Sequence, residues 1–335
     1  MRTNSRLRAM FALFAIALIA LGVAACGSDD STSSTADVTD KGSTDTPDVT
    51  TIVDNPDNGK VKLTIGSKNF TEQYILGEIY AQGLEAAGYD VDTDLNLGSE
   101  TIALKALQDG EISGYPEYTS TALTSFFKAK PEDVPGDAQQ AYEDSKEDFA
   151  KLGLETFPPT PFSSANAVGL LTETADDLGV KTISDLEGKS EDLTLAGSPE
   201  CRQRIDCLLG LQENYGLEFG EFTPIDIALR YQVLDKGDAD LSILFTTDAQ
   251  LFTDPDKYTI LEDDKGVLPA GNVLFIADEK TVKEAGPDFA KTIEDVQTGL
   301  TLQTMQELNA RVDVDKEKPA DVAHQYLSEL GYIDD

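Results

Sequence analysis

The 335-residue sequence is poor in two kinds of residue that many functions need, histidine and the basic residues. It contains one histidine, and only 26 Lys and Arg against 62 Asp and Glu, which gives a formal net charge of −36. A single histidine excludes Ser-His-Asp and Cys-His catalytic sets and His-rich zinc sites. Nucleic-acid binding is excluded as well, because phosphate contacts need a basic surface. We interpret the acidic excess as an aid to solubility and salt tolerance rather than as a means of drawing cations toward a cleft.

Enzyme motifs are missing too. The sequence has no GxSxG, HExxH or phosphate-loop spacing, and we expect His324 to be an ordinary residue of a helix at 321–330. A carboxylate pair such as Glu111 and Glu117 is available, but glycosidase-like chemistry also needs a defined separation and an acid of raised pKa. We therefore expect no catalytic residues, no cofactor and no metal site.

One long apolar run occurs in the sequence, at its N-terminus. Arg2, Arg6 and Arg8 precede an uncharged stretch at 9–25, and small residues end this stretch just before Cys26. The pattern is typical of a lipoprotein signal peptide, and the run is shorter than the ~20 residues of a comfortable membrane span. Instead of a retained transmembrane anchor, we expect removal of residues 1–25, acylation of Cys26 and lipid attachment at the extracytoplasmic face of the cell membrane.

The segment after this cysteine has almost no large apolar residue. Ser, Thr, Asp, Gly and Pro dominate residues 27–59, so the segment cannot bury enough surface to offset its ordering entropy. We predict a disordered tether at 26–59 and a folded part that begins at residue 60. That remainder is long enough for two modest domains or one large one.

Strand and helix patterns alternate in the first part of the folded region. Apolar residues at helical spacing follow a predicted capping box of Asn69 and Glu72. The order β-α-β-α-β predicts a mainly parallel sheet flanked by helices. The strands are expected at 61–65, 89–97 and 112–115, and the second helix at 101–108.

One piece of this region has a second copy later in the chain. Residues 103–119 and 228–247 share the order helix, acidic-glycine turn, strand and Thr-bearing turn, which indicates two similar lobes rather than a solenoid. We expect the chain to cross between lobes at 154–171 and to return at 243–251, with Asp248 as a hinge or cap residue. Two crossings form a hinge about which a cleft closes. The predicted lobes comprise 60–162 with 247–335, and 163–246.

Three blocks of sequence carry a family resemblance. They are IGSKNFTEQ at 65–73, NLGSETIALKALQDGEISGYPEYTSTAL at 96–123 and ALRYQVLDKGDADL at 228–241. In order and spacing the chain resembles the extracytoplasmic substrate-binding proteins of ABC importers for glycine betaine, choline and related osmoprotectants, from about residue 60 to near the C-terminus. The resemblance implies an α/β, two-lobed type II periplasmic-binding-protein fold with a ligand cleft between the lobes. It also implies capture of a small osmolyte and delivery to an ABC permease and its ATPase.

The resemblance further implies a tyrosine cage drawn from both lobes. A quaternary ammonium has no N–H donor, so aromatic ring faces attract it, by ~0.5–2 kcal/mol per ring. Tyr118 and Tyr231 match two cage positions, whereas Asn166 and Leu208 depart from the pattern. Polar segments between a strand and a helix also offer free N–H groups to ligands. The predicted ligand residues, each with an ordinary cap, turn or core role as the alternative, are Lys68, Asn69, Gln73, Tyr118, Thr121, Asn166 and Tyr231.

Two of the three cysteines lie close together. Cys201 and Cys207 are six residues apart, and on a regular helix this spacing places the side chains about 240° apart, so that pairing needs a turn between them. Outside the cytoplasm disulfides persist, so we favour a disulfide bond over two free thiols. A metal site is least favoured because no further ligands complete it.

The cargo stays open at this point. A protein of the same type for a different polar or carboxylated solute is the first alternative, and a surface hydrolase or an adhesion or sensor lipoprotein are alternatives from other classes. We expect a monomer whose partners are a small solute, the permease with its ATPase, and the membrane through its lipid.

Overall fold

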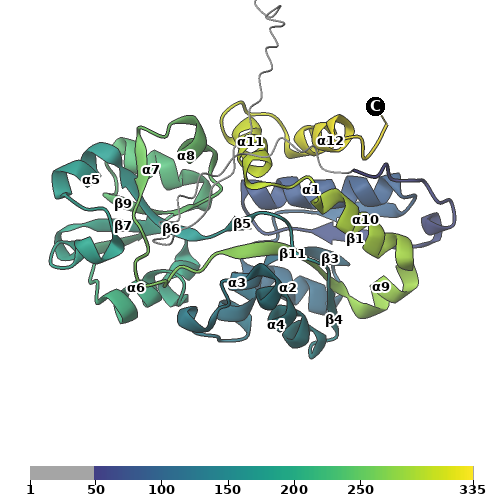
Figure 1. The fold of residues 1–335 in the computed structure, drawn as a ribbon, viewed down its shortest axis with the longest axis horizontal. Coiled ribbons are helices and arrows are strands. Elements are labelled where there is room, and N and C mark those ends of the chain that lie inside the picture. Colours follow the sequence, from purple (N-terminus) through teal and green to yellow (C-terminus); the bar gives the residue numbers. More distant parts are fainter. Residues whose placement is uncertain (1–48, 335) are drawn as a thin grey trace, which may run out of the picture. The chain divides into compact units, whose positions relative to one another are not determined.

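The computed structural model describes residues 49–334, and this part contains two β-sheets with helices packed against them (Figure 1). The first sheet has the strand order β2-β1-β3-β11-β4, and β5 pairs with β11 beside that row. β1 is parallel to β2 and β3, whereas β11 is antiparallel to β3 and β4. The strands are β1 (Lys62–Gly66), β2 (Asp90–Asp94), β3 (Gly114–Tyr118), β4 (Leu154–Thr156), β5 (Ser163–Ser164) and β11 (Gly271–Asp278).

The second sheet has the strand order β10-β6-β9-β7-β8. β7 is parallel to β8 and β9, and β6 is antiparallel to β9 and β10. Because β11 belongs to the first sheet, the whole second sheet is inserted between two parts of the first. The strands are β6 (Asn166–Leu171), β7 (Thr194–Gly197), β8 (Glu221–Pro224), β9 (Leu241–Phe245) and β10 (Tyr258–Ile260).

Each sheet has its own helices and hydrophobic core, and we call the two assemblies the first and the second lobe. The helices of the first lobe are α1 (Thr71–Ala86), α2 (Glu100–Asp109), α3 (Thr119–Thr121), α4 (Ala138–Ala150), α9 (Glu279–Ala285), α10 (Pro287–Gln297), α11 (Leu302–Asp313) and α12 (Pro319–Glu329). Those of the second lobe are α5 (Thr172–Leu178), α6 (Leu208–Tyr215), α7 (Arg230–Lys236) and α8 (Ala249–Thr253).

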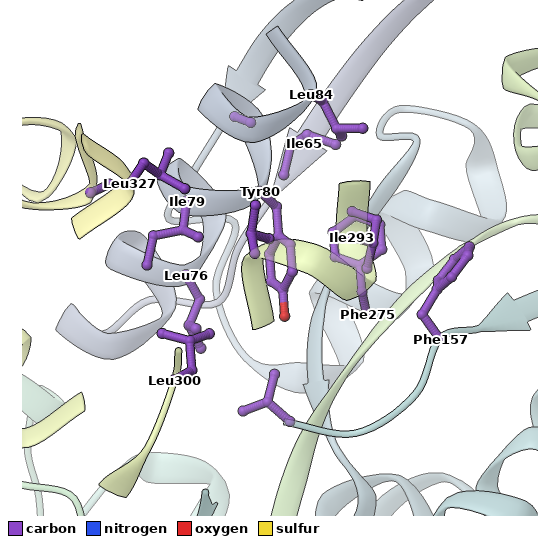
Figure 2. Packing of buried hydrophobic residues seen from close by; sticks show 14 of the residues in the cluster. Ile65, Leu76, Ile79, Tyr80, Leu84, Phe157, Phe275, Ile293, Leu300 and Leu327 are labelled. Carbon is purple, nitrogen blue, oxygen red and sulfur yellow. The ribbon is translucent and has the colours of Figure 1, made fainter. Parts of the chain in front are cut away.

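The main core of the first lobe is built on α1, whose apolar residues pack toward β11 and the C-terminal helices (Figure 2). Tyr80 of α1 meets Phe275 of β11 with 4.7 Å between the ring centroids. The Tyr80 hydroxyl donates to Gln297 Oε1 at 2.9 Å, so its polar end is satisfied while the ring is buried. This packing fixes the start of α1, and the segment directly before that helix carries several residues of the site described below.

The predicted order β-α-β-α-β is confirmed by β1, α1, β2, α2 and β3. The three strands are parallel, with β1 between β2 and β3. Two local predictions are wrong. Asn69 and Glu72 form no capping box, because Phe70 precedes α1 and no side chain caps this helix. β3 spans Gly114–Tyr118 rather than 112–115. Pro116 fits inside it because β1 pairs with β3 only at Gly114, so no strand on that side needs the missing N–H group.

The folded part begins before residue 60. The Ile52 N–H donates to the Tyr332 carbonyl at 2.8 Å, and the buried Asn58 side chain donates to the Ala87 carbonyl at 2.8 Å. The prediction of a disordered tether is therefore wrong for residues 49–59. Hydrogen bonds to distant parts of the first lobe hold this segment in place, and Val49 and Ile52 pack against the main core of that lobe.

The chain crosses from the first sheet to the second at Ala165, between β5 and β6, inside the predicted crossing segment. The predicted return at 243–251 is wrong, because the chain continues into α8 and then into β10, which pairs with β6 in the second sheet. The return lies between β10 and β11. We therefore propose that the second lobe extends to about Leu268, a residue of its core, rather than to residue 246.

Among residues 49–334, no helix combines the length and the apolar character that crossing a membrane requires. The predicted signal peptide at residues 1–25, Cys26 and the predicted tether up to residue 48 lie outside the described residues.

Candidate functional site

A cavity of about 90 Å³ lies between residues of the two lobes. A single water needs ~10–15 Å³, so the cavity suits a small molecule. The first lobe contributes residues from three places: the segment after β1, the start of α2 with the residue before it, and the end of β3 with the residues after it. They are Lys68, Asn69, Phe70, Ser99, Glu100, Tyr118, Ser120 and Thr121. The second lobe contributes residues around β6, β7, β9 and α7, among them Asn166, Gly197, Ser198, Arg204, Asp206, Arg230, Ile243 and Phe245.

Aromatic rings from both lobes meet at this cavity. Phe70 and Tyr118 of the first lobe are stacked with 6.3 Å between their centroids. Phe245, the last residue of β9 in the second lobe, tilts against Phe70 at 5.2 Å. Together the three rings give the cavity an apolar wall to which both lobes contribute.

Lys68 places a positive charge beside this wall. Its ammonium group forms an ion pair with Glu117, and both side chains are buried. Lys68 Nζ also lies 4.5 Å from the centroid of Tyr118 and 5.9 Å from that of Phe70. Glu117 is held in turn by the Tyr115 hydroxyl at 3.1 Å and the Tyr118 N–H at 2.7 Å. The cation is therefore fixed over the rings, which attract it through their negative faces.

Tyr118 is tied to the junction of the lobes by a buried carboxyl group. Its hydroxyl donates to Glu72 Oε1 at 2.5 Å, and Asn309 Nδ2 donates to Glu72 Oε2 at 3.0 Å. The same amide nitrogen also donates to the Thr247 carbonyl at 3.0 Å, just after β9. Burial raises the pKa of Glu72 above its ordinary value of 4.5, although the hydrogen bonds from Tyr118, Thr247 and Asn309 act in the opposite direction.

Arg230 opens α7 and lies at the end of the cavity nearest to this junction. It donates to both oxygens of Asp248, at 2.9 Å and 2.5 Å, and to the Ile227 carbonyl at 2.7 Å. Asp248 also accepts hydrogen bonds from the Tyr231 hydroxyl and the Phe245 N–H. These contacts are within the second lobe, so the arginine braces the strand end that carries the third aromatic ring. Arg230 Nη2 also lies 3.8 Å from Asp313 Oδ2 of the first lobe.

Arg204 lies at another end of the cavity, on the segment between Cys201 and Cys207. It donates to both oxygens of Asp206 at 2.8 Å and 2.5 Å, and its Nη1 is 3.4 Å from Glu100 Oε2 of the first lobe. Burial alone would raise the pKa of Asp206, but the neighbouring guanidinium holds it below its ordinary value.

The charges that line the cavity are balanced. Three cationic and three anionic side chains take part, although the whole chain carries a formal charge of −36. A site of this kind suits a neutral or zwitterionic molecule better than a free ion of either sign. The six side chains are Lys68, Arg204, Arg230, Glu100, Glu200 and Asp206.

Five of the seven residues predicted to bind ligand line this cavity, namely Lys68, Asn69, Tyr118, Thr121 and Asn166. The side chain of Gln73 is buried beneath it, where its Oε1 accepts the Lys68 N–H at 3.2 Å. Tyr231 packs edge-on against Tyr258 with 4.8 Å between the centroids and is not part of the cavity wall. Their role in binding stays a prediction.

The predicted disulfide bond joins Cys201 and Cys207 in the structure, and both residues are buried in the core of the second lobe. Leu208, which departs from the cage pattern, belongs to the same core. In the part of the chain that the structure describes, no group of three or more His, Cys, Asp or Glu side chains is placed to hold a metal ion.

The sequence reasoning missed Phe70, Phe245, Arg204 and Arg230 as wall residues. Phe70 lies in the short polar segment at 67–71 that links β1 to α1, the kind of segment expected to offer N–H groups to ligands, so its position gave a signal that was not used. Arg230 directly precedes Tyr231, and Arg230 rather than the expected Tyr231 lines the cavity. Nothing local in the sequence distinguishes Phe245 from an ordinary strand residue.

Known proteins resemble this chain over most of its length. Residues 61–329 match the family described as substrate binding domain of ABC-type glycine betaine transport system. The glycine-betaine-binding protein of Pseudomonas aeruginosa is 35% identical over 285 residues, which cover 82% of this chain and 89% of that protein. The ergothioneine transport permease/ergothioneine binding protein EgtU of Helicobacter pylori is 29% identical over 271 residues, which cover 80% of this chain and 48% of that protein.

Solved structures agree with the sequence relatives. The crystal structure described as glycine betaine/carnitine/choline ABC transporter matches with a TM-score of 0.63 and 27% identity, and the match covers 82% of this chain and 100% of that one. The expected α/β fold, a two-lobed type II periplasmic-binding-protein architecture, is thereby confirmed. The chain belongs to the family of substrate-binding domains of ABC-type glycine betaine transport systems.

Proposed function

We propose that this protein captures a small zwitterionic osmolyte of the glycine betaine type in the cavity between its lobes and delivers it to an ABC permease with its ATPase. One observation carries the proposal, namely the three aromatic rings from both lobes that line a cavity of balanced charge. The protein acts by binding and release, without covalent chemistry on the solute.

The rings account for the cationic end of such a solute. A trimethylammonium group offers only C–H groups, so its partners are ring faces rather than hydrogen-bond acceptors. Phe70, Tyr118 and Phe245 supply these rings, although Lys68 already lies over the first two and Arg230 over the third, so the solute has to use the ring surface that these cations leave open. Phe245 replaces the tyrosine expected from the second lobe. Because the rings come from both lobes, a bound solute stabilises the arrangement in which the lobes meet.

The cations account for the carboxylate end. Lys68, Arg204 and Arg230 line the same cavity, and a carboxylate among them gains charge-assisted hydrogen bonds. Choline has the same cationic head and no carboxylate, so we expect it to bind more weakly than glycine betaine. This discrimination separates a betaine site from one that only recognises quaternary amines.

The location of the protein follows from its N-terminal sequence. We propose that acylated Cys26 anchors a monomer at the extracytoplasmic face of the membrane, with the segment after it as a tether. Cys26→Ala should release the exported protein from membranes. A Cys26→Ala protein that stays with the membrane fraction contradicts the anchor.

Calorimetric titration tests the ligand, with glycine betaine, carnitine, choline, ergothioneine, a neutral amino acid and a sugar as the panel. We expect glycine betaine to bind, and Phe245→Ala to cost ~1–3 kcal/mol of binding through lost ring face and apolar contact. Phe252→Ala is the matched control, because Phe252 lies in α8 near the same strand end and is 46% exposed. It should leave the affinity unchanged.

The outcomes separate the alternatives. Binding of none of the quaternary compounds rejects the betaine proposal, and binding of another panel member then identifies a different polar solute. Chemical turnover of a bound compound indicates a hydrolase. Equal affinities for the Phe245→Ala and Phe252→Ala proteins mean that the ring wall is not the site.

A further inference from the structure

We infer that the disulfide loop, defined as residues 201–207 and closed by the Cys201–Cys207 bond, positions Arg204 against Glu100 and thereby sets how tightly the protein holds its solute. The inference rests on the proposed solute binding for its affinity readout. It assigns to the cross-link a role at the binding site in addition to any role in stability.

The ends of the disulfide loop are fixed in the second lobe. Cys201 and Cys207 are 1% and 3% exposed, and the Leu208 N–H donates to Cys201 Sγ at 3.2 Å. Between these ends, the main-chain hydrogen bonds from Arg204 N–H to Cys201 and from Cys207 N–H to Arg204 are long, at 3.3 and 3.2 Å. These bonds are at the upper edge of the ordinary range, and the 3-10 helix at Pro199–Gln203 ends before Arg204, so the cross-link adds a restraint that the backbone of the second half of the loop otherwise lacks.

Two further contacts determine where the loop lies. Asn166 Nδ2 donates to the Asp206 carbonyl at 2.8 Å and ties the loop to β6. On the other side, the loop packs so closely against α6 that a Cβ on Gly210 would lie 1.7 Å from the Ile205 carbonyl oxygen. Asn166, which departs from the expected tyrosine cage, thus has a positioning role in this chain.

The loop carries a charged contact between the lobes. Arg204 is held by Asp206 of its own loop, and its Nη1 faces Glu100 Oε2 at 3.4 Å, in the first turn of α2 of the first lobe. Glu100, Glu200 and Arg204 line both the cavity and a second hollow of about 530 Å³. The contact therefore lies at the boundary between the two spaces, and a solute that leaves on this side has to separate Arg204 from Glu100.

The order of the loop then affects affinity. A pre-positioned arginine meets Glu100 and the solute without a further loss of conformational freedom, whereas an arginine on a loose loop has to be ordered at each binding event. Loss of the cross-link should appear mainly as faster dissociation, because contacts formed after encounter govern how long a ligand stays bound.

The test compares the exported wild-type protein with Cys201→Ser/Cys207→Ser, using glycine betaine as the probe. We expect an affinity about tenfold lower, which corresponds to about 1.4 kcal/mol, with most of the change in the dissociation rate. Circular dichroism and the binding stoichiometry check that the variant is folded. An unchanged affinity overturns the inference.

A double-mutant cycle separates positioning from stability. Glu100→Gln should weaken binding several-fold in the wild-type background and have little further effect in the double-serine background, where Arg204 is no longer held in place. A cross-link that only stabilised the second lobe would leave the effect of Glu100→Gln equal in both backgrounds, and that result overturns the inference. If the double-serine protein does not fold, Asn166→Ala takes its place in the same cycle with the disulfide intact.

Hydrogen–deuterium exchange tests the contact between Arg204 and Glu100 in the absence of any solute. Removing the disulfide from the second lobe should speed exchange of the Ile102 and Ala103 amides in the first turn of α2, while the amides of α10 stay unchanged as an internal control. If the wild-type protein binds no betaine and this difference is present, the proposed function fails and the positioning role stands. If betaine binds and exchange at α2 is unaltered, the positioning role fails and the proposed function stands.

Discussion

Two ends of the cavity hold the same kind of ion pair in different surroundings. Arg230 and Arg204 each donate to both oxygens of an aspartate of the second lobe, Asp248 and Asp206 respectively. Each also faces a carboxylate of the first lobe, at 3.8 Å and 3.4 Å. The Arg230 side chain is 8% exposed and the Arg204 side chain is 19% exposed.

The surroundings give the two pairs different tasks. Asp248 also accepts hydrogen bonds from the Tyr231 hydroxyl and the Phe245 N–H. Separating Arg230 from Asp248 would therefore disturb several hydrogen bonds at the end of β9. Arg204 borders a second hollow, and its side chain is more exposed than that of Arg230. A more deeply buried pair is costlier to break than a pair nearer the surface. We infer that the Arg230 end is a fixed brace and the Arg204 end is the side that opens.

The largest effect is expected from breaking the enclosed pair. Arg230→Ala leaves Asp248 buried without its cation, and removal of one partner of a buried pair costs ~3–5 kcal/mol. Urea unfolding should show this loss of the free energy of unfolding. Lys236→Ala removes an exposed cation from the same helix and should change stability by no more than ~0.5 kcal/mol. Equal effects of the two substitutions would contradict the role of Arg230 as a brace.

A smaller loss of stability is expected at the other end. Arg204→Ala removes charge-assisted hydrogen bonds to Asp206 beside the second hollow and should cost ~1.5–3 kcal/mol in urea unfolding. Arg202→Ala, at an exposed position on the same loop, is the control. It loses one hydrogen bond to the Phe222 carbonyl and should cost no more than ~1 kcal/mol. If Arg204→Ala destabilises the protein more than Arg230→Ala does, the assignment of brace and opening side is reversed.

Much of the fold follows from sequence patterns, because they are local. Helical spacing after Thr71 and the glycine that ends α2 at Gly110 predict α1 and α2 well. β11 was not predicted as a strand, although it pairs with β3, β4 and β5. Its partners lie more than 100 residues away, so no local period reveals the antiparallel pairing. The late return to the first lobe was missed for the same reason.

The site was only partly predictable because tertiary packing selects which neighbour faces the cavity. Arg230 and Tyr231 are adjacent on α7, and the arginine rather than the tyrosine lines the wall. Phe245 meets Phe70 across the two lobes, and no spacing rule links positions so far apart. The family pattern led to Lys68 and Tyr118, but it did not give the ion pairs that surround them.

The smallest expected effect is a dependence of the free energy of unfolding on pH, and it arises from Glu72. This carboxyl group belongs to the Arg230 end, since Asn309 links it to the Thr247 carbonyl next to Asp248. The other groups that face it are the Tyr118 hydroxyl and, more remotely, the negative charge of Asp248, which adds to the rise in its pKa. The protonation state of Glu72 should therefore affect the contacts at the Arg230 end and leave those of Arg204 unchanged.

The direction of the effect follows from linkage. Burial raises the pKa of Glu72 in the folded protein above its ordinary value of 4.5, so above that pH the unfolded chain loses this proton first. The contribution of Glu72 to the free energy of unfolding is therefore most favourable below pH 4.5 and declines as the pH rises toward the folded-state pKa. Glu72→Gln cannot ionise and removes this decline. Urea unfolding over a pH series should show wild-type stability, relative to Glu72→Gln, falling with increasing pH.

Glu78→Gln makes the same change of side chain on the same helix as the control. A difference between wild type and Glu72→Gln that stays constant or grows with pH would show that Glu72 is ionised in the fold, and that the Arg230 end tolerates a further buried negative charge.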